Sequence, residues 1–364
     1  MKRALSILLL LALFLSACCV STAEEEGAEG TVAIYSSMYP FVLEMLDQAI
    51  HEKFPGLIPG GENGSFFIYD GSTALIKRIE DGMKTGVLEC DMMLVAEPSL
   101  SIEMKEKNYL APVEIPGITD LLRFPCDEKG YWYPVRVCNM VLAYNPELEA
   151  DWNGKGITIP RTFQQFAADR SLKGLISMGD PMTSGTTFAS VAALTSRYGR
   201  QFLKGLGQNM VRIEKASSAM ERIQEGSCAV AMILEETVLK TLKDAEDAGQ
   251  PLTNLACIYP EDGAVLIPST VMTVADAHSA NHNTASCAAL EKWFLTGEAQ
   301  AIIMEGFMHS VLREQKEGPW HSMETDSLAE RMMSVDWDNT YRYRSELNNA
   351  WLDIVYFNSS VSSR

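Results

Sequence analysis

Strand-like and helical segments alternate along most of this chain, and that alternation limits the folds open to it more than any other feature. Residues 32–35 read as a strand and 41–54 as a helix, and the same order recurs at 65–69 and 73–83. The second half of the chain repeats it at 174–178, 188–198, 217–225 and 229–233. This pattern predicts an α/β architecture in which helices cover a largely parallel sheet. About 335 residues follow residue 29, more than one typical core needs, so we expect two lobes.

Small hydroxyl-bearing residues stand where several of these strands give way to helices. The clearest case is the run 180–187, in which a proline and four hydroxylic residues lead directly into a helical pattern. A helix N-terminus leaves backbone N–H groups unpaired and carries a partial positive charge, so hydroxyls there can hold an anion's oxygens. The same residue types also serve as ordinary helix caps. Because the pattern recurs at three distant helix starts, we expect a ligand-binding cleft formed by Ser36, Ser37, Gly71, Ser72, Thr73, Ser184, Gly185, Thr186 and Thr187.

The N-terminus has the features of an export signal. Lys2 and Arg3 precede an apolar stretch over 5–15, which is too short to span a bilayer. The run 15–18 (LSAC) resembles a bacterial lipobox, so we expect cleavage of residues 1–17 and lipidation of Cys18. An ordinary signal peptide cleaved near Ala23 is the alternative. Residues 18–30 read as a tether, so we expect the mature protein outside the cytoplasm, held at a membrane by its lipid alone.

The charge balance excludes one class of partner. Asp and Glu number 48 against 30 Lys and Arg, which gives a formal net charge of −18. Nucleic-acid binding needs a basic face for phosphate contacts, so we expect no nucleic acid. Cys90, Cys138 and Cys228 lie in apolar, strand-like runs, and no pair has zinc-like spacing, so we expect buried thiols and no metal site of that kind.

No catalytic motif is evident along the chain. The sequence has five histidines, and it lacks a GxSxG elbow, an HExxH pair and a Walker loop. We therefore expect no enzymatic activity and no cofactor, and a secreted enzyme is the least favoured reading. A structural surface lipoprotein would predict repeats or an exposed apolar face, and neither is evident.

Taken in order, the lipobox, the hydroxyl-bearing junctions, the Asn-containing run 135–145 and the run 259–263 resemble a known family. They are similar to the type II extracellular solute-binding proteins of ABC importers, the group that binds ferric ion, thiamine, phosphonates and sugar phosphates. The resemblance implies two α/β lobes joined by two crossing strands and closing by a hinge. It implies that lobe one comprises 31–138 and 271–364, and lobe two 139–270. It also implies a small-molecule solute, a cognate permease in the inner membrane, and a monomer on the periplasmic or extracytoplasmic side.

The resemblance also bears on the ligand. The run 180–187 is similar to the hydroxyl loop of the sugar-phosphate and aminoethylphosphonate binders, which implies a phosphoryl- or phosphonyl-bearing solute. Arg136 would then add a charge-assisted bond to the anion, or else form a structural ion pair between the lobes. Glu235 would contact the other end of the ligand, a hydroxyl or an amine. Glu97, at a strand end, is a second candidate for that role or an ordinary solvated acid.

Iron and thiamine stay open as alternative ligands. Ferric-binding relatives hold the metal with two adjacent tyrosines after a strand of lobe two, and the matching place here holds Glu235 and Glu236. Iron would therefore need carboxylates or a synergistic anion, and thiamine or its phosphate is a further possibility.

Overall fold

The computed structural model describes residues 28–96 and 98–356. The expected signal peptide, Cys18 and the tether up to residue 27 lie outside the described residues, as does Glu97. The side chain of Thr73 is also outside what is described. In the described part, no helix combines the length and apolar character needed to cross a membrane.

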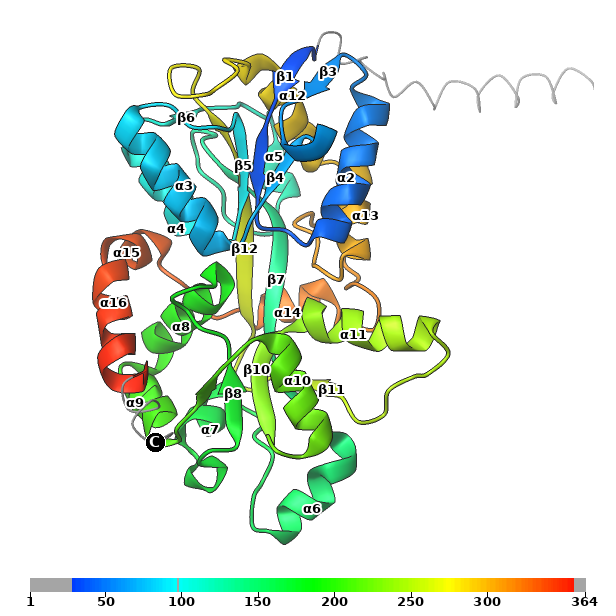
Figure 1. Ribbon diagram of the computed structural model, residues 1–364, viewed down its shortest axis with the longest axis vertical. Helices are drawn as coiled ribbons and strands as arrows, with labels where there is room; N and C mark the ends of the chain where they lie inside the picture. Colours follow the sequence, from blue (N-terminus) through cyan, green and yellow to red (C-terminus); the bar gives the residue numbers. More distant parts are fainter. Residues whose placement is uncertain (1–27, 97, 357–364) are drawn as a thin grey trace, which may run out of the picture.

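Two lobes lie one above the other around a pair of long central strands (Figure 1). These strands are β7 (Tyr133–Tyr144) and β12 (Val265–Val274), which pair antiparallel. They are buried along nearly their whole length, as crossing strands between two lobes must be. The register shifts between Ser269 and Thr270, and Thr270 lies opposite Pro134. Pro134 has no N–H to donate, and an irregularity in the ladder is where a sheet tolerates it.

One sheet continues through both lobes, in the order β4-β2-β5-β12-β7-β10-β8-β9. On the lobe-one side lie three parallel strands: β2 (Ile34–Ser36), β4 (Phe67–Tyr69) and β5 (Met92–Val95). On the lobe-two side lie another three parallel strands: β8 (Ile176–Met178), β9 (Arg212–Ile213) and β10 (Val230–Leu234). The α/β prediction is confirmed, and the expected lobe boundaries near 138 and 270 fall inside the two crossing strands.

Most of these parallel strands run into a helix. In lobe one these helices are α2 (Pro40–Lys53), α3 (Ser72–Thr85) and α4 (Pro98–Glu106). In lobe two they are α8 (Gly185–Tyr198), α10 (Ala216–Glu225) and α11 (Glu235–Asp247). The remaining helices are α5 (Ile118–Leu121), α6 (Glu149–Gly154), α7 (Phe163–Ala168), α9 (Gln201–Gln208), α12 (Thr284–Phe294), α13 (Gly297–Glu305), α14 (Thr325–Glu330), α15 (Trp337–Arg342) and α16 (Arg344–Trp351). The short remaining elements are β1 (Gly30–Val32), β3 (Leu57–Pro59), β6 (Leu110–Ala111), β11 (Ala256–Ile258), η1 (Glu62–Gly64), η2 (Pro146–Leu148), η3 (Arg170–Leu172) and η4 (Leu352–Tyr356).

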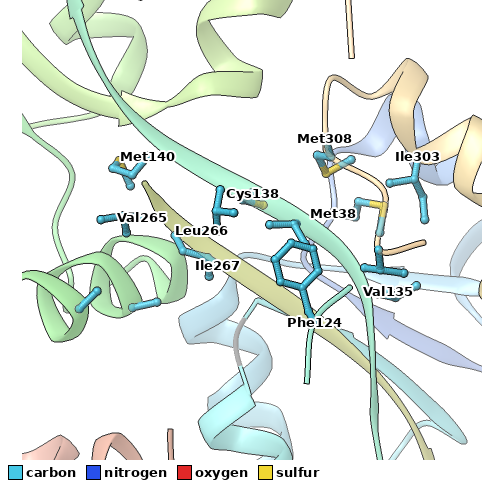
Figure 2. Close-up of a cluster of buried hydrophobic side chains, with 14 of the residues drawn as sticks. Met38, Phe124, Val135, Cys138, Met140, Val265, Leu266, Ile267, Ile303 and Met308 are labelled. Carbon is cyan, nitrogen blue, oxygen red and sulfur yellow. The ribbon is translucent and has the colours of Figure 1, made fainter. Parts of the chain in front are cut away.

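The main hydrophobic core follows the crossing strands from one lobe to the other. Figure 2 shows Cys138 and Met140 on β7 beside Val265, Leu266 and Ile267 on β12. Burial raises the pKa of the Cys138 thiol. All six cysteines in the described ranges are free, and Cys90, Cys138 and Cys228 are buried as expected.

The C-terminal helices link the two lobes. α15 packs on α4 of lobe one, whereas the turn η4, which follows α16, packs on α9 of lobe two. Between them, Arg344 hydrogen-bonds Ser99 of α4, and its guanidinium lies 5.1 Å from the ring centre of Phe188 in α8. The turn η4, which we expected in lobe one with the rest of 271–364, therefore lies against lobe two. Sequence pattern could not reveal this, because a helical period does not say which lobe a helix covers.

Candidate functional site

A cavity of about 670 Å³ lies between the lobes. Lobe one contributes Tyr39 and Tyr69, and lobe two contributes the residues that follow β8, β9 and β10. These three strands are parallel, so their carboxyl ends meet at one edge of the sheet, where ligands of α/β proteins commonly bind. The volume is within the usual range for a small-molecule site, about 300–1,000 Å³.

The start of α8 brings three hydroxyls together at this cavity. Ser184 is the N-cap, and its Oγ accepts from the backbone N–H of Thr187 at 3.2 Å. The hydroxyls of Thr186 and Thr187 each lie 3.1 Å from Ser184 Oγ. The backbone N–H groups of Gly185 and Thr186 have no partner within the helix, because they belong to its first turn. Ser184 is thus the N-cap of α8 and also lines the cavity. The two interpretations of the run 180–187, as a helix cap and as part of a cleft, are therefore compatible.

A glycine on the preceding strand end makes room for this cluster. A Cβ added to Gly179 would lie 2.8 Å from the Thr187 hydroxyl. Any larger residue at 179 would therefore displace a hydroxyl that faces the cavity.

One lysine and two carboxylates line the cavity. Lys215 lies just before α10 and lines the cavity, and among the described residues it has no ion-pair partner. The Glu214 carboxylate accepts from the Ser177 hydroxyl at 2.7 Å and from Arg222 Nε at 2.9 Å. Asp180 accepts from the backbone N–H of Met182 at 2.9 Å. Glu214 is thus paired with Arg222, whereas Asp180 has one backbone hydrogen bond and keeps its negative charge. The groups of the cavity that attract an anion are the Lys215 ammonium and the helix N-termini.

The lobe-one junctions meet α8 across a second, smaller hollow. Ser37, Ser72 and Gly185 line it, and the Ser37 hydroxyl is buried without a hydrogen-bond partner among the described residues. A Cβ added to Gly185 would lie 3.3 Å from Ser72 Cβ and 3.1 Å from Ala96 Cβ. Nearby, the hydroxyls of Tyr39 and Thr237 lie 2.8 Å apart. The lobes therefore touch at the cleft.

Residues 90–338 match the family of bacterial extracellular solute-binding proteins. The chain belongs to that family. Its fold is the two-lobed fold of type II periplasmic binding proteins, and its role is that of the substrate-binding component of an ABC importer. The family acts in transport, outside the cytoplasm, with a small-molecule solute and a cognate permease as partners.

Solved structures of similar fold bind different ligands. Iron-bound HitA from Pseudomonas aeruginosa has a TM-score of 0.71 at 17% identity, covering 89% of this chain and 99% of its own. AfuA from Actinobacillus pleuropneumoniae, with fructose-6-phosphate bound, has a TM-score of 0.69 at 18% identity, covering 90% and 99%. The ferric binding protein from Campylobacter jejuni has a TM-score of 0.67 at 16% identity, covering 89% and 99%. No curated protein matches the sequence significantly. At these identities the likeness shows the fold and leaves the ligand open.

Several expected site residues of this solute-binding protein lie elsewhere. Ser36 is fully buried, and its hydroxyl accepts from the backbone N–H of Met38 at 3.1 Å. Arg136 is 4% exposed in the core of the hinge and donates to Met308 Sδ at 2.7 Å. Gly71 is the N-cap of α3 and has no atom within 4 Å of an added Cβ. None of these three is among the residues that line the cavity.

Glu235, expected at the ligand, is enclosed behind the cavity wall. Its carboxylate is fully buried and accepts from Asn139 at 2.8 Å and from the hydroxyls of Tyr259 and Ser322, with His309 Nε2 at 3.0 Å. Burial alone would raise the pKa of Glu235, but these hydrogen bonds more than offset it, and the pKa is lowered. Contrary to the expectation from sequence, Glu235 does not line the cavity in this structure, and its carboxylate is bonded within the protein.

Glu236 has the opposite environment. It is 2% exposed, and neither carboxyl oxygen has a hydrogen-bond partner among the described residues. Burial raises its pKa from 4.5 to about 7, against the opposing charge of Arg136. Across the described ranges, no group of three His, Cys, Asp or Glu side chains is placed to hold a metal ion.

Sequence reasoning missed Lys215 and the two cavity tyrosines. β9, which positions Lys215, is only two residues long, so no strand pattern marks the junction. Tyr39 and Tyr69 stand at strand-to-helix junctions already singled out for their hydroxyls. Their position beside Ser37 and Gly71 was the signal that could have found them.

Proposed function

We propose that this solute-binding protein captures a small solute bearing a phosphoryl or phosphonyl group. The observation that carries the proposal is Lys215, a cation without an ion-pair partner among the described residues, in a cavity where Glu214 is already paired with Arg222. The hydroxyls of Ser184, Thr186 and Thr187 stand at the start of α8 in the same cavity. A doubly charged anion with several acceptor oxygens uses all of these groups at once.

Lys215 and the helix N-terminus must attract an anion although the chain as a whole is negatively charged. The net charge of −18 repels anions at long range. Screening limits that repulsion to about 8–10 Å at physiological salt, so contacts inside the cavity decide the affinity. Backbone N–H groups and a lysine within hydrogen-bond distance of the anion are sufficient for this purpose.

Closure of the lobes completes the proposed binding site. Ser37 and Ser72 of lobe one meet the start of α8 only when the lobes are together. The Ser37 hydroxyl, buried and without a partner among the described residues, lines the small hollow at this contact. A hinge-closing protein of this kind binds its solute when shut and releases it to the permease on opening.

Titration calorimetry on the stripped protein tests the proposal. A panel of phosphorylated and phosphonylated solutes should include a saturable binder. Lys215→Met should weaken that binder tenfold or more, since a charge-assisted bond contributes about 1.5–3 kcal/mol. Lys173→Met removes an exposed lysine of the same lobe outside the cavity and serves as the control. Saturable binding of ferric ion, with no phosphorylated binder, would instead favour iron, bound with a synergistic anion.

We also propose that Cys18 carries the lipid anchor and that the protein is a monomer. The support for the anchor is the lipobox at 15–18. Cys18→Ser should abolish incorporation of labelled palmitate and release the protein from membranes. Incorporation that persists in this variant would refute lipidation at Cys18.

A further inference from the structure

The last described stretch of the chain, residues 336–356, contacts both lobes. It contains α15, α16 and η4, and Figure 1 shows it passing the level at which the two lobes meet. α15 packs on α4 of lobe one, and its Trp337 and Tyr341 pack against a hydrophobic cluster of that lobe. At the other end of the stretch, η4 packs on α9 of lobe two. The two ends of one short segment are therefore held by different lobes.

The attachment to lobe two is tight. Trp351 and Val355 are 1% and 0% exposed and belong to the main hydrophobic core. The backbones of η4 and α9 are so close that a Cβ added to Gly207 would lie 2.2 Å from a carbonyl oxygen of η4. Glu346 of α16 forms an exposed ion pair at 2.5 Å with Arg200, the N-cap of α9. An exposed pair contributes little, so the buried side chains hold this end of the segment.

Between the two attachments lies a junction with little packing. α15 ends at Arg342 and α16 begins at Arg344, so only Tyr343 separates the two helices. A cavity of about 240 Å³ lies at this junction, lined by residues of α15 and α16 and by residues of α8 and α9. Tyr343 lines that cavity and is 55% exposed, unlike the buried side chains of η4. We therefore expect the segment to bend at Tyr343 when the lobes move.

The Arg344 side chain contacts both lobes at once. Its guanidinium donates to the Ser99 hydroxyl on α4 and lies 5.1 Å from the ring centre of Phe188 on α8. Ser99 and Phe188 each lie three residues after a residue at which the lobes touch, since a Cβ added to Gly185 would lie 3.1 Å from Ala96 Cβ. Opening of the cleft separates α4 from α8, so it must break at least one contact of Arg344.

We propose that residues 336–356 form a strap that holds the lobes together, with Arg344 as its latch across the cleft. The crossing strands β7 and β12 allow the lobes to rotate, and the strap limits how far they rotate apart. The latch is a charged donor on a hydroxyl together with a cation over an aromatic ring, two contacts of moderate strength. It can therefore break at each opening, while the buried end at η4 stays attached. The strap acts in the protein without ligand, so the inference does not depend on the proposed solute.

X-ray scattering on the ligand-free full chain tests the strap. Arg344→Ala removes both latch contacts, so the ratio of open to closed protein should rise roughly tenfold and the radius of gyration should increase. Ser99→Ala removes only the hydrogen bond to lobe one and should give a smaller increase. The double variant should match Arg344→Ala, because the two residues act in one contact. Arg342→Ala, at an exposed arginine of the same segment, is the matched control. Equal radii for the wild-type protein and Arg344→Ala would overturn the proposal.

Urea denaturation of the same variants separates a latch from a contact that only stabilises the fold. A latch predicts a larger radius for Arg344→Ala with a denaturation midpoint close to that of the wild-type protein, because each lobe keeps its own core. Arg344→Lys keeps a charged donor for Ser99 but loses the planar group over Phe188, so its radius should be intermediate. A lowered midpoint with an unchanged radius in Arg344→Ala would make Arg344 a stabiliser of the fold and overturn its role as a latch.

Discussion

The Glu235 carboxylate and the His309 imidazole lie 3.0 Å apart, fully buried, where lobe two meets lobe one. Glu235 begins α11 of lobe two, and His309 pairs through its backbone with Val137 of the crossing strand β7. Asn139 of the same strand donates to the same carboxylate at 2.8 Å. The pair therefore joins α11 to the crossing strand β7 and stabilises the folded protein.

Removing the Glu235 carboxylate should destabilise the protein. Glu235→Ala leaves the buried donors of His309, Asn139 and Tyr259 without their acceptor, which costs about 3–5 kcal/mol of unfolding free energy. Glu235→Gln keeps the volume and one acceptor, so we expect a smaller loss. Urea denaturation measures both. Unchanged stability with a tenfold loss of ligand affinity would return Glu235 to the binding site.

Glu236 should make stability depend on pH. Its pKa is raised from 4.5 to about 7 by burial, so the folded state binds a proton that the unfolded state has lost. The contribution of the Glu236 carboxyl to the free energy of unfolding is therefore fully present below pH 4.5. It is lost as the pH rises from there through 7. The shift corresponds to a loss on the order of 3 kcal/mol. The groups that influence this carboxyl are Arg136, Cys138, Tyr39 and Glu235.

Glu236→Gln isolates this effect. The neutral amide removes the titration, so the variant should be more stable than the wild-type protein at pH 8 and close to it at pH 4.5. Glu221→Gln, at an exposed site on α10, should follow the wild type throughout. Chemical denaturation at several pH values gives the comparison. Parallel pH profiles for wild type and Glu236→Gln would show that the buried carboxyl does not titrate in this range.

Gly185 should control how far the lobes close. Because an added Cβ already meets Ala96 and Ser72, Gly185→Val should hold the lobes apart at this contact. We expect weaker ligand binding and a larger radius of gyration of the ligand-saturated protein by X-ray scattering. Gly154→Val is the control, since no atom lies within 4 Å of an added Cβ there. Normal compaction of Gly185→Val on ligand addition would mean that the lobes meet elsewhere.

Local signals in the sequence predicted the fold and part of the cavity. Proline, serine and glycine at 181–185 mark the start of α8, and the same junction lines the cavity. The strand–helix alternation and the long crossing segments likewise depend on neighbouring residues, which a sequence displays directly. The two-lobed α/β fold and the solute-binding family were both predicted correctly on this basis.

Long-range partners account for what the sequence did not reveal. Glu235 is satisfied by Asn139 and His309, which lie 96 and 74 residues away in the chain. Without those partners a carboxylate after a strand looks like a ligand contact, which is why the sequence led us to place Glu235 at the ligand. For Arg136 the sequence left open an anion contact or a structural ion pair, and only its bond to Met308 shows that it lies inside the hinge.

Native mass spectrometry of the protein, after incubation with a deproteinised bacterial extract and desalting, tests the central claim most directly. The account predicts a one-to-one complex whose released small molecule contains phosphorus. A retained ferric ion, or a retained organic molecule without phosphorus, would contradict it.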